Sequence, residues 1–141
     1  MEKYVHTVQY YETDKMGIAH HSNYIRWMEE ARVDFFDRIG LSYKALESAG
    51  VFSPVIGVEC SFKSPTTFED AVEIGVKVEE FKGVKLILSY QMVKRGSGEI
   101  AATARSEHCF VDGGGKLIVL KKAHPDIDEK LKRLADGARG A

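Results

Sequence analysis

Apolar residues follow two different spacings along the chain, and the change of spacing marks the predicted elements. Between Tyr24 and Ile39 apolar side chains recur every three or four residues, which places them on one face of a helix. Ser22 or Asn23 can cap the start of this helix by accepting a backbone N–H, and Gly40 can end it in a left-handed conformation. The pattern therefore predicts one long amphipathic helix.

Elsewhere apolar and polar residues mostly alternate one by one, which is typical of half-buried strands. Short turns separate successive alternating segments, so neighbouring strands are expected to run antiparallel. The strands predicted in this way cover residues 4–10, 58–62, 72–78, 84–92, 100–110 and 117–120. A short helix is expected over 42–48, and a C-terminal helix over about 125–136 precedes a tail expected to be frayed. These elements define an α+β architecture in which the sheet wraps the long helix.

Length and charge narrow the class of protein. The 141 residues fit a single domain spanning 1–141, and 44% hydrophobic residues supply a core, which excludes intrinsic disorder. The 20 Lys and Arg residues balance 21 Asp and Glu residues, so no general attraction to nucleic acid is expected. The first residues lack the apolar region of a signal peptide, and no apolar run is long enough to cross a membrane. We therefore expect a cytoplasmic protein without a nucleic-acid or membrane partner.

The richest group of chemically active side chains lies between the first strand and the long helix. Asp14 and two histidines, His20 and His21, stand on a loop that leads into the N-terminus of that helix. Asp14 could accept a proton from water or attack a carbonyl, while backbone N–H groups near residues 21–24 could stabilise the resulting oxyanion. The structural alternative is that Asp14 caps a turn and both histidines are surface residues. Adjacent histidines lack the spacing of a metal site, so no metal is expected.

The segment Tyr11–Arg32 resembles the opening of the 4-hydroxybenzoyl-CoA thioesterase-like hotdog family of small bacterial acyl-CoA thioesterases. The family pattern D-x-x-G-x-x-x-H-x-N-Y is matched by Asp14, Gly17, His21, Asn23 and Tyr24. Residues 105–117 are similar to the fifth strand and following turn of that family. The resemblance implies a hotdog fold, a curved antiparallel sheet of about five strands around one long central helix, over a core of about residues 3–120.

The resemblance also implies roles for individual residues. Asp14 is expected to be the catalytic carboxylate, acting as general base or as nucleophile. The His21 backbone N–H is expected to lead the oxyanion site, and the His21 side chain to orient water or substrate. Gly17, Tyr11 and Tyr24 are expected to shape or line the substrate site. At neutral pH an aspartate of ordinary acidity is ionised and needs no metal to act.

An acyl-CoA substrate brings phosphates that require local cations. The resemblance points to Lys82 and Lys85, which flank a hairpin turn, and Lys63, Lys94 and Arg95 are further candidates. No separate cofactor is expected, because CoA is part of the substrate. The family also implies a homodimer or homotetramer that joins sheet edges and forms its sites at the subunit interface.

Several functions remain open at this point. Hydrolysis of an acyl-CoA thioester to a carboxylic acid and free CoA is the first expectation, and acyl carrier protein thioesters are an alternative substrate class. A non-catalytic domain that binds or senses acyl-CoA is the leading rival from another class. A hotdog hydratase or dehydratase would usually need a catalytic histidine on the long helix, whereas His21 precedes it. The acyl group itself is not readable from the sequence.

Overall fold

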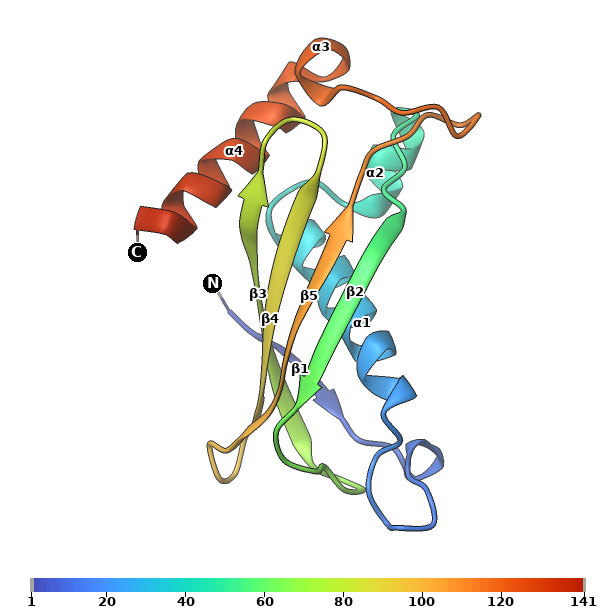
Figure 1. Cartoon of the computed structure of the whole chain (residues 1–141), viewed down its shortest axis with the longest axis vertical. Helices are drawn as coiled ribbons and strands as arrows, with labels where there is room; N and C mark the ends of the chain where they lie inside the picture. Colours follow the sequence, from blue (N-terminus) through green and yellow to red (C-terminus); the bar gives the residue numbers. More distant parts are fainter. Residues whose placement is uncertain (1, 141) are drawn as a thin grey trace. The chain divides into compact units, whose positions relative to one another are not determined.

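The computed structural model describes residues 2–140, with side chains described up to Gly137. Five strands form one open sheet in the order β1-β3-β4-β5-β2, which places β1 and β2 at its two edges (Figure 1). The strands are β1 (Tyr4–Thr7), β2 (Val55–Phe62), β3 (Ala71–Phe81), β4 (Leu86–Lys94) and β5 (Ile100–His108). The helices are the 3-10 turn η1 (Tyr10–Glu12), α1 (Ser22–Arg38), α2 (Tyr43–Ser48), α3 (Leu120–Ala123) and α4 (Pro125–Gly140).

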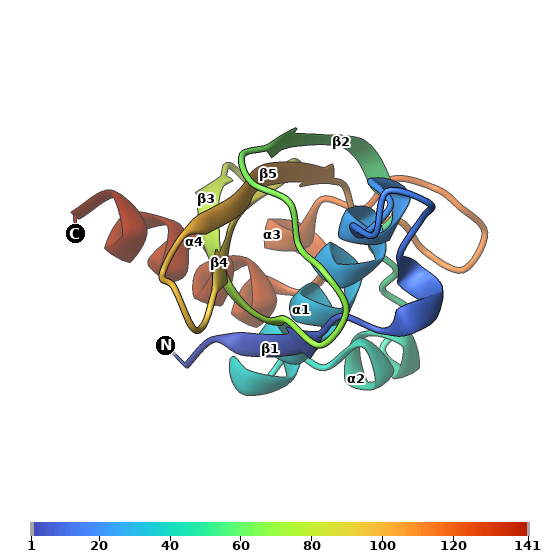
Figure 2. The same ribbon diagram turned by 90° about the horizontal axis from the view of Figure 1, so that it is seen from below.

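The chain groups into two compact units, and each has its own buried residues. The first comprises residues up to Phe35 together with Cys60–Val76 and Tyr90–Ala104. In it β1 pairs antiparallel with the start of β3, and the segment that follows β1 leads into α1 (Figure 2). The buried face of α1 in this unit includes the apolar residues that the sequence pattern selects, Tyr24, Trp27, Met28, Ala31 and Phe35, together with the charged Arg32.

The second unit comprises Phe36–Glu59, Lys77–Ser89 and the residues from Arg105 on. Its buried residues include residues at the end of β3, at the start of β4 and on α4. The buried apolar residues include Phe36, Leu46, Val78, Phe81, Leu86, Leu88, Phe110, Leu120, Ile127 and Leu131. The rings of Phe81 and Phe110 meet edge to face, with centroids 6.1 Å apart.

The long helix is confirmed, with a difference at its start. It ends where Gly40 adopts a φ of 80°, as expected for a glycine that terminates a helix. Ser22 and Asn23, predicted as caps, are instead the first residues of α1. The Ser22 hydroxyl pairs with the His20 ring at 2.9 Å, and the Asn23 amide donates to the Glu12 carbonyl at 2.9 Å. In contrast, α2 is capped as a short helix should be, because the Ser42 hydroxyl accepts from Ala45 N–H.

Several predicted boundaries are wrong: strands β2, β3, β4 and β5 begin or end two or three residues from the predicted positions, and three other segments differ as well. The first strand ends at Thr7, since Tyr10–Glu12 turn into η1. The strand predicted over 117–120 does not form: Leu117 makes one isolated bridge to Val111, and the chain turns into α3 at Leu120. Alternation over four residues is too short to separate a strand from the start of a helix. Finally, α4 continues to Gly140 where a frayed tail was expected from residue 137, while Ala141 lies outside the described residues.

Candidate active site

The loop that carries Asp14 is closed by backbone hydrogen bonds at both of its ends. Thr13 bridges to Ala19, and Asp14 N–H donates to the Ile18 carbonyl at 2.9 Å. Gly17 completes the turn with a φ of 80° and donates its N–H to the Asp14 carbonyl at 2.9 Å. A positive φ is unfavourable for a residue with a Cβ, which explains the glycine at this position. The loop therefore holds the Asp14 backbone in a defined place.

The Asp14 carboxylate is exposed, and its two oxygens differ in their surroundings. Oδ1 accepts a hydrogen bond from Met16 N–H at 2.8 Å. Oδ2 has no hydrogen-bond or ion-pair partner within residues 2–140. The structural alternative, that Asp14 caps a turn, is thus correct for one oxygen. The second oxygen remains available to a water molecule or a substrate.

The start of α1 supplies one unpaired backbone donor. Ser22 N–H donates to the His20 ring at 3.2 Å, Asn23 N–H to the His20 carbonyl at 3.0 Å, and Tyr24 N–H to the His21 carbonyl at 3.2 Å. The His21 N–H donates no hydrogen bond within the part of the chain that the structure describes. Of the N–H groups predicted for an oxyanion site over residues 21–24, His21 alone is unpaired in this range. It lies at the positive end of a 17-residue helix.

Asp14 and His21 line the same cavity, which lies within the first unit and has a volume of about 370 Å³. Its wall is formed by two segments far apart in the sequence, residues 14–24 and 62–65. The lining residues are Asp14, Met16, Ile18, Ala19, His21, Tyr24, Phe62, Lys63, Ser64 and Pro65. A cavity of this size can hold part of a small organic ligand.

An aromatic wall supports one side of the cavity. The Tyr24 and Phe62 rings meet edge to face with centroids 5.0 Å apart, and the Tyr24 hydroxyl bonds the buried Thr66 hydroxyl at 2.9 Å. Burial raises the pKa of Tyr24 above its ordinary value, so its hydroxyl stays neutral near pH 7. Tyr24 therefore lines the cavity with an uncharged side chain, and its role in binding substrate stays a prediction.

Lys63 is the cation of this cavity. Its side chain is exposed, and it forms no ion pair within residues 2–140. Lys82 and Lys85 lie in the second unit, and each has an acidic partner, Glu80 at 2.9 Å and Glu107 at 3.7 Å respectively. The structure thus brings Lys63, a lesser candidate from the sequence, together with Asp14.

Two other predicted residues do not line the cavity. Tyr11 is 82% exposed, and its role in binding stays a prediction. Gly17 does not line the cavity itself, but it forms the turn of the loop that carries Asp14. Among the described residues, no group of three or more His, Cys, Asp or Glu side chains is placed to hold a metal ion. No helix within residues 2–140 is long and apolar enough to span a bilayer.

Sequence reasoning missed the buried carboxylate beneath the loop. Glu12 is 4% exposed and accepts hydrogen bonds from Trp27 Nε1 at 2.7 Å and Gln9 N–H at 2.8 Å, and His6 Nε2 lies 2.8 Å from it. Burial alone would raise the pKa of Glu12, but these hydrogen bonds outweigh it and lower the pKa. A glutamate within a polar loop sequence gives little sign of burial, because its partners come from β1 and α1.

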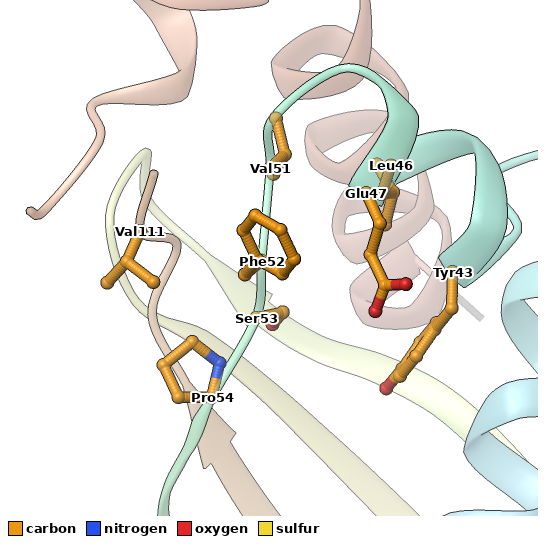
Figure 3. Close-up of a pocket in the computed structure, with 8 residues that line it drawn as sticks. All are labelled: Tyr43, Leu46, Glu47, Val51, Phe52, Ser53, Pro54 and Val111. Carbon is orange, nitrogen blue, oxygen red and sulfur yellow. The ribbon is translucent and has the colours of Figure 1, made fainter. Parts of the chain in front are cut away.

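A second cavity lies in the second unit and has a volume of about 270 Å³. Its walls are apolar except for the side chains of Tyr43, Glu47 and Ser53. Figure 3 shows Tyr43 and Glu47 extending from α2 beside the segment that carries Phe52, Ser53 and Pro54. None of the site residues predicted from the sequence lines this cavity.

Comparison with known proteins identifies the family. A model of the thioesterase-like superfamily matches residues 8–133. The chain belongs to this superfamily. The resemblance found in the loop and helix start is thereby confirmed.

Relatives of this thioesterase-like chain include YneP of Bacillus subtilis (strain 168), 36% identical over 120 residues that cover 84% of the chain and 86% of YneP. The acyl-CoA thioesterase YbgC of Helicobacter pylori is 30% identical over 81 residues, covering 57% of the chain and 59% of YbgC. The crystal structure of DHNA-CoA thioesterase from Staphylococcus aureus superposes with a TM-score of 0.92 at 29% identity, covering 99% of this chain and 95% of that one. The predicted α+β hotdog fold is confirmed by this similarity.

Proposed function

We propose that this protein is an acyl-CoA thioesterase that hydrolyses a thioester to a carboxylic acid and free CoA. One observation carries the proposal: a carboxylate with an unpaired oxygen, on Asp14, and an unpaired N–H at a helix start, on His21, line the same cavity. Membership of the thioesterase-like superfamily and similarity to named acyl-CoA thioesterases support it.

Asp14 can act in either of two ways. As a general base, it takes a proton from water while the water oxygen attacks the thioester carbonyl carbon. As a nucleophile, it attacks that carbon itself, and water then hydrolyses the mixed anhydride. In both cases the carbonyl oxygen becomes an oxyanion that accepts a hydrogen bond from the His21 N–H, and collapse of the tetrahedral intermediate expels the CoA thiolate. The exposed His21 ring lies beside this path and is suited to orienting water or substrate.

Recognition of CoA requires cations near its phosphates. Lys63 lines the cavity and has no ion-pair partner within the described residues, so it is the best placed of the candidate lysines to bind a substrate phosphate. Binding by Lys82 and Lys85 would require each to exchange a protein carboxylate for a phosphate. Lys82 and Lys85 are the alternative phosphate-binding pair. CoA enters as part of the substrate, and the proposed steps use no separate cofactor.

We also propose that subunits associate through β2 into a homodimer or a homotetramer, with sites at the interface. This edge strand exposes apolar side chains on both faces: Val55, Ile56, Val58 and Phe62 are each about half exposed. An unpaired, apolar strand edge is a template for pairing with another chain. Phe62 belongs both to β2 and to the cavity wall, so a partner on this edge would lie next to the site.

The test is release of free thiol from short-chain, long-chain and aromatic acyl-CoAs by the wild type and by Asp14→Asn. Asparagine keeps the oxygen that accepts from Met16, so the loop is retained and only the ionised carboxylate is lost. Asp112→Asn is a matched control, because Asp112 Oδ1 accepts from Gly114 N–H at 2.9 Å in a similar exposed turn. We expect Asp14→Asn to lower kcat by about 10²–10⁴-fold and Asp112→Asn to leave it unchanged.

Other outcomes would favour the alternatives. Binding of acyl-CoA without turnover by the wild type would indicate a sensing domain. Higher kcat/KM for acyl carrier protein thioesters than for the matching acyl-CoAs would change the substrate class. Full activity of Asp14→Asn would contradict the catalytic assignment.

A further inference from the structure

Next to the Asp14 loop in the sequence, Glu12 belongs to a partly buried chain of acidic and basic groups that the proposed reaction does not use. The ring of His6, which is 8% exposed, stands between two carboxylates: Nε2 is 2.8 Å from Glu12 Oε1 and Nδ1 is 2.9 Å from Glu30 Oε1. The hydroxyl of Tyr4 donates to the same oxygen of Glu30 at 2.8 Å, and burial together with Glu30 raises the pKa of Tyr4 to about 12. The ring of His6 therefore links Glu12 to Glu30 through its two nitrogens.

Glu12 connects this chain to the loop. Both of its carboxylate oxygens are used, Oε1 by Gln9 N–H and His6, and Oε2 by the Trp27 indole. Its side chain is thus fastened to β1 through His6 and to α1 through Trp27. A buried carboxylate bound on three sides is a fixed point in the structure, because losing any partner would leave a buried charge poorly solvated.

The backbone of Glu12 holds the other end of the loop. Its carbonyl accepts the N–H of His20 at 2.8 Å and the side-chain amide of Asn23 at 2.9 Å. Asp14 follows Glu12 by two residues, and the unpaired N–H of His21 belongs to the residue after His20. One residue therefore sets the position of both groups that the proposed mechanism requires.

We propose that Glu12 and His6 are positioning residues, which fix the Asp14 carboxylate and the His21 N–H at the separation that thioester hydrolysis needs. This inference rests on the proposed function. Neither side chain lines the cavity, so neither touches substrate there. Reacting groups displaced by about 1 Å lose about 10²-fold in rate, and a loosened Glu12 would displace both groups at once.

The kinetic test uses Glu12→Gln and His6→Asn, each with a matched control from the second unit. Asp128→Asn changes another carboxylate of similar burial, 5% exposed, and His108→Asn changes another buried histidine, 1% exposed. We expect kcat to fall about 10- to 100-fold in Glu12→Gln and His6→Asn while KM stays within about twofold, and both controls to keep the wild-type kcat. The double variant should lose no more than Glu12→Gln alone, because the two side chains act through one network.

Two further readouts do not depend on activity. Trp27 is the chain's single tryptophan, its indole donates to Glu12, and its ring centroid is 4.7 Å from that of His6. Both substitutions alter a side chain that contacts the indole, so the Trp27 emission should differ from that of the wild type in each variant. Hydrogen exchange of the backbone amides over residues 13–21 should quicken in both variants, most clearly at His20, whose N–H donates to Glu12.

The outcomes separate this inference from the proposed function. If the wild type hydrolyses no thioester, the proposed function fails, and hydrogen exchange still decides whether Glu12 and His6 hold the loop. Unchanged exchange over residues 13–21 in folded variants would overturn the inference. A kcat within twofold of wild type in folded Glu12→Gln and His6→Asn would also overturn it, as would an equal loss of kcat in the two controls.

Discussion

Replacing Gly17 by alanine isolates the cost of the turn that carries Asp14. A Cβ at this position would meet no atom within 4 Å, so the substitution causes no steric clash with the rest of the chain. The remaining cost is that of the backbone conformation. Gly17 has a φ of 80°, and an alanine in that region costs about 1–2 kcal/mol. Gly96 is a matched control: a Cβ there also meets nothing within 4 Å, but its φ is not positive. Gly96→Ala should stabilise the protein by about 0.4–1 kcal/mol through the unfolded chain.

The unfolded-chain effect is common to both variants, so their free energies of unfolding should differ by the cost of the turn alone, roughly 1–2 kcal/mol. Urea denaturation measures this difference directly, and the midpoint should shift without a change in slope. Thiol release measured on the same samples, well below the unfolding transition, should show a lower kcat for Gly17→Ala, because the strained turn carries Asp14, the proposed catalytic carboxylate. Equal unfolding free energies for the two variants would refute the reasoning, and so would full kcat in a destabilised Gly17→Ala.

Three further predictions concern other parts of the structure. The pKa of Glu12 is lowered in the folded protein, so its ionised form stabilises the fold above the unfolded carboxyl pKa of about 4.3. This stabilisation is lost as pH falls through the lower pKa of the folded protein. The free energy of unfolding should therefore change less with acid pH in Glu12→Gln than in the wild type. Tyr24→Phe leaves the fully buried Thr66 hydroxyl without its tyrosine partner, and urea denaturation should show a loss of about 1–3 kcal/mol; no loss would contradict the importance of this bond. Val58→Asp places a charge on the exposed face of β2 and should convert the proposed homodimer or homotetramer to monomers in light scattering; an unchanged mass would exclude β2 as the interface.

The long helix and the loop before it could be predicted because their signals are local. The three-and-four spacing of apolar residues selects the buried face of α1, and Gly40 marks its end. Asp14 and His21 could be selected together because the loop and the helix start that they occupy are contiguous in the sequence. Both residues therefore come from one short segment of the sequence.

Other parts of the site depend on segments that are distant in sequence. Lys63 and Phe62 reach the cavity from the end of β2, which no local pattern connects with residue 14. In the sequence Glu12 resembles a solvent-exposed loop residue, whereas in the structure it is buried and bonded to His6 and Trp27. The single-domain organisation, the oligomer and the cytoplasmic location stay predictions.

The exposed edge of β2 also has a consequence for solubility. Residues 55–62 read V-I-G-V-E-C-S-F, with Glu59 as the one charge, and such β-prone segments aggregate when an edge leaves them open. Proline precedes this segment at Pro54, and a lysine and a second proline follow it at Lys63 and Pro65. Residues of these types at the ends of an apolar strand limit the growth of intermolecular sheets. Lys63 would thus have two roles, since it would bind a substrate phosphate and also limit aggregation. Replacing it by an apolar residue should lower the solubility of the protein as well as its affinity for acyl-CoA.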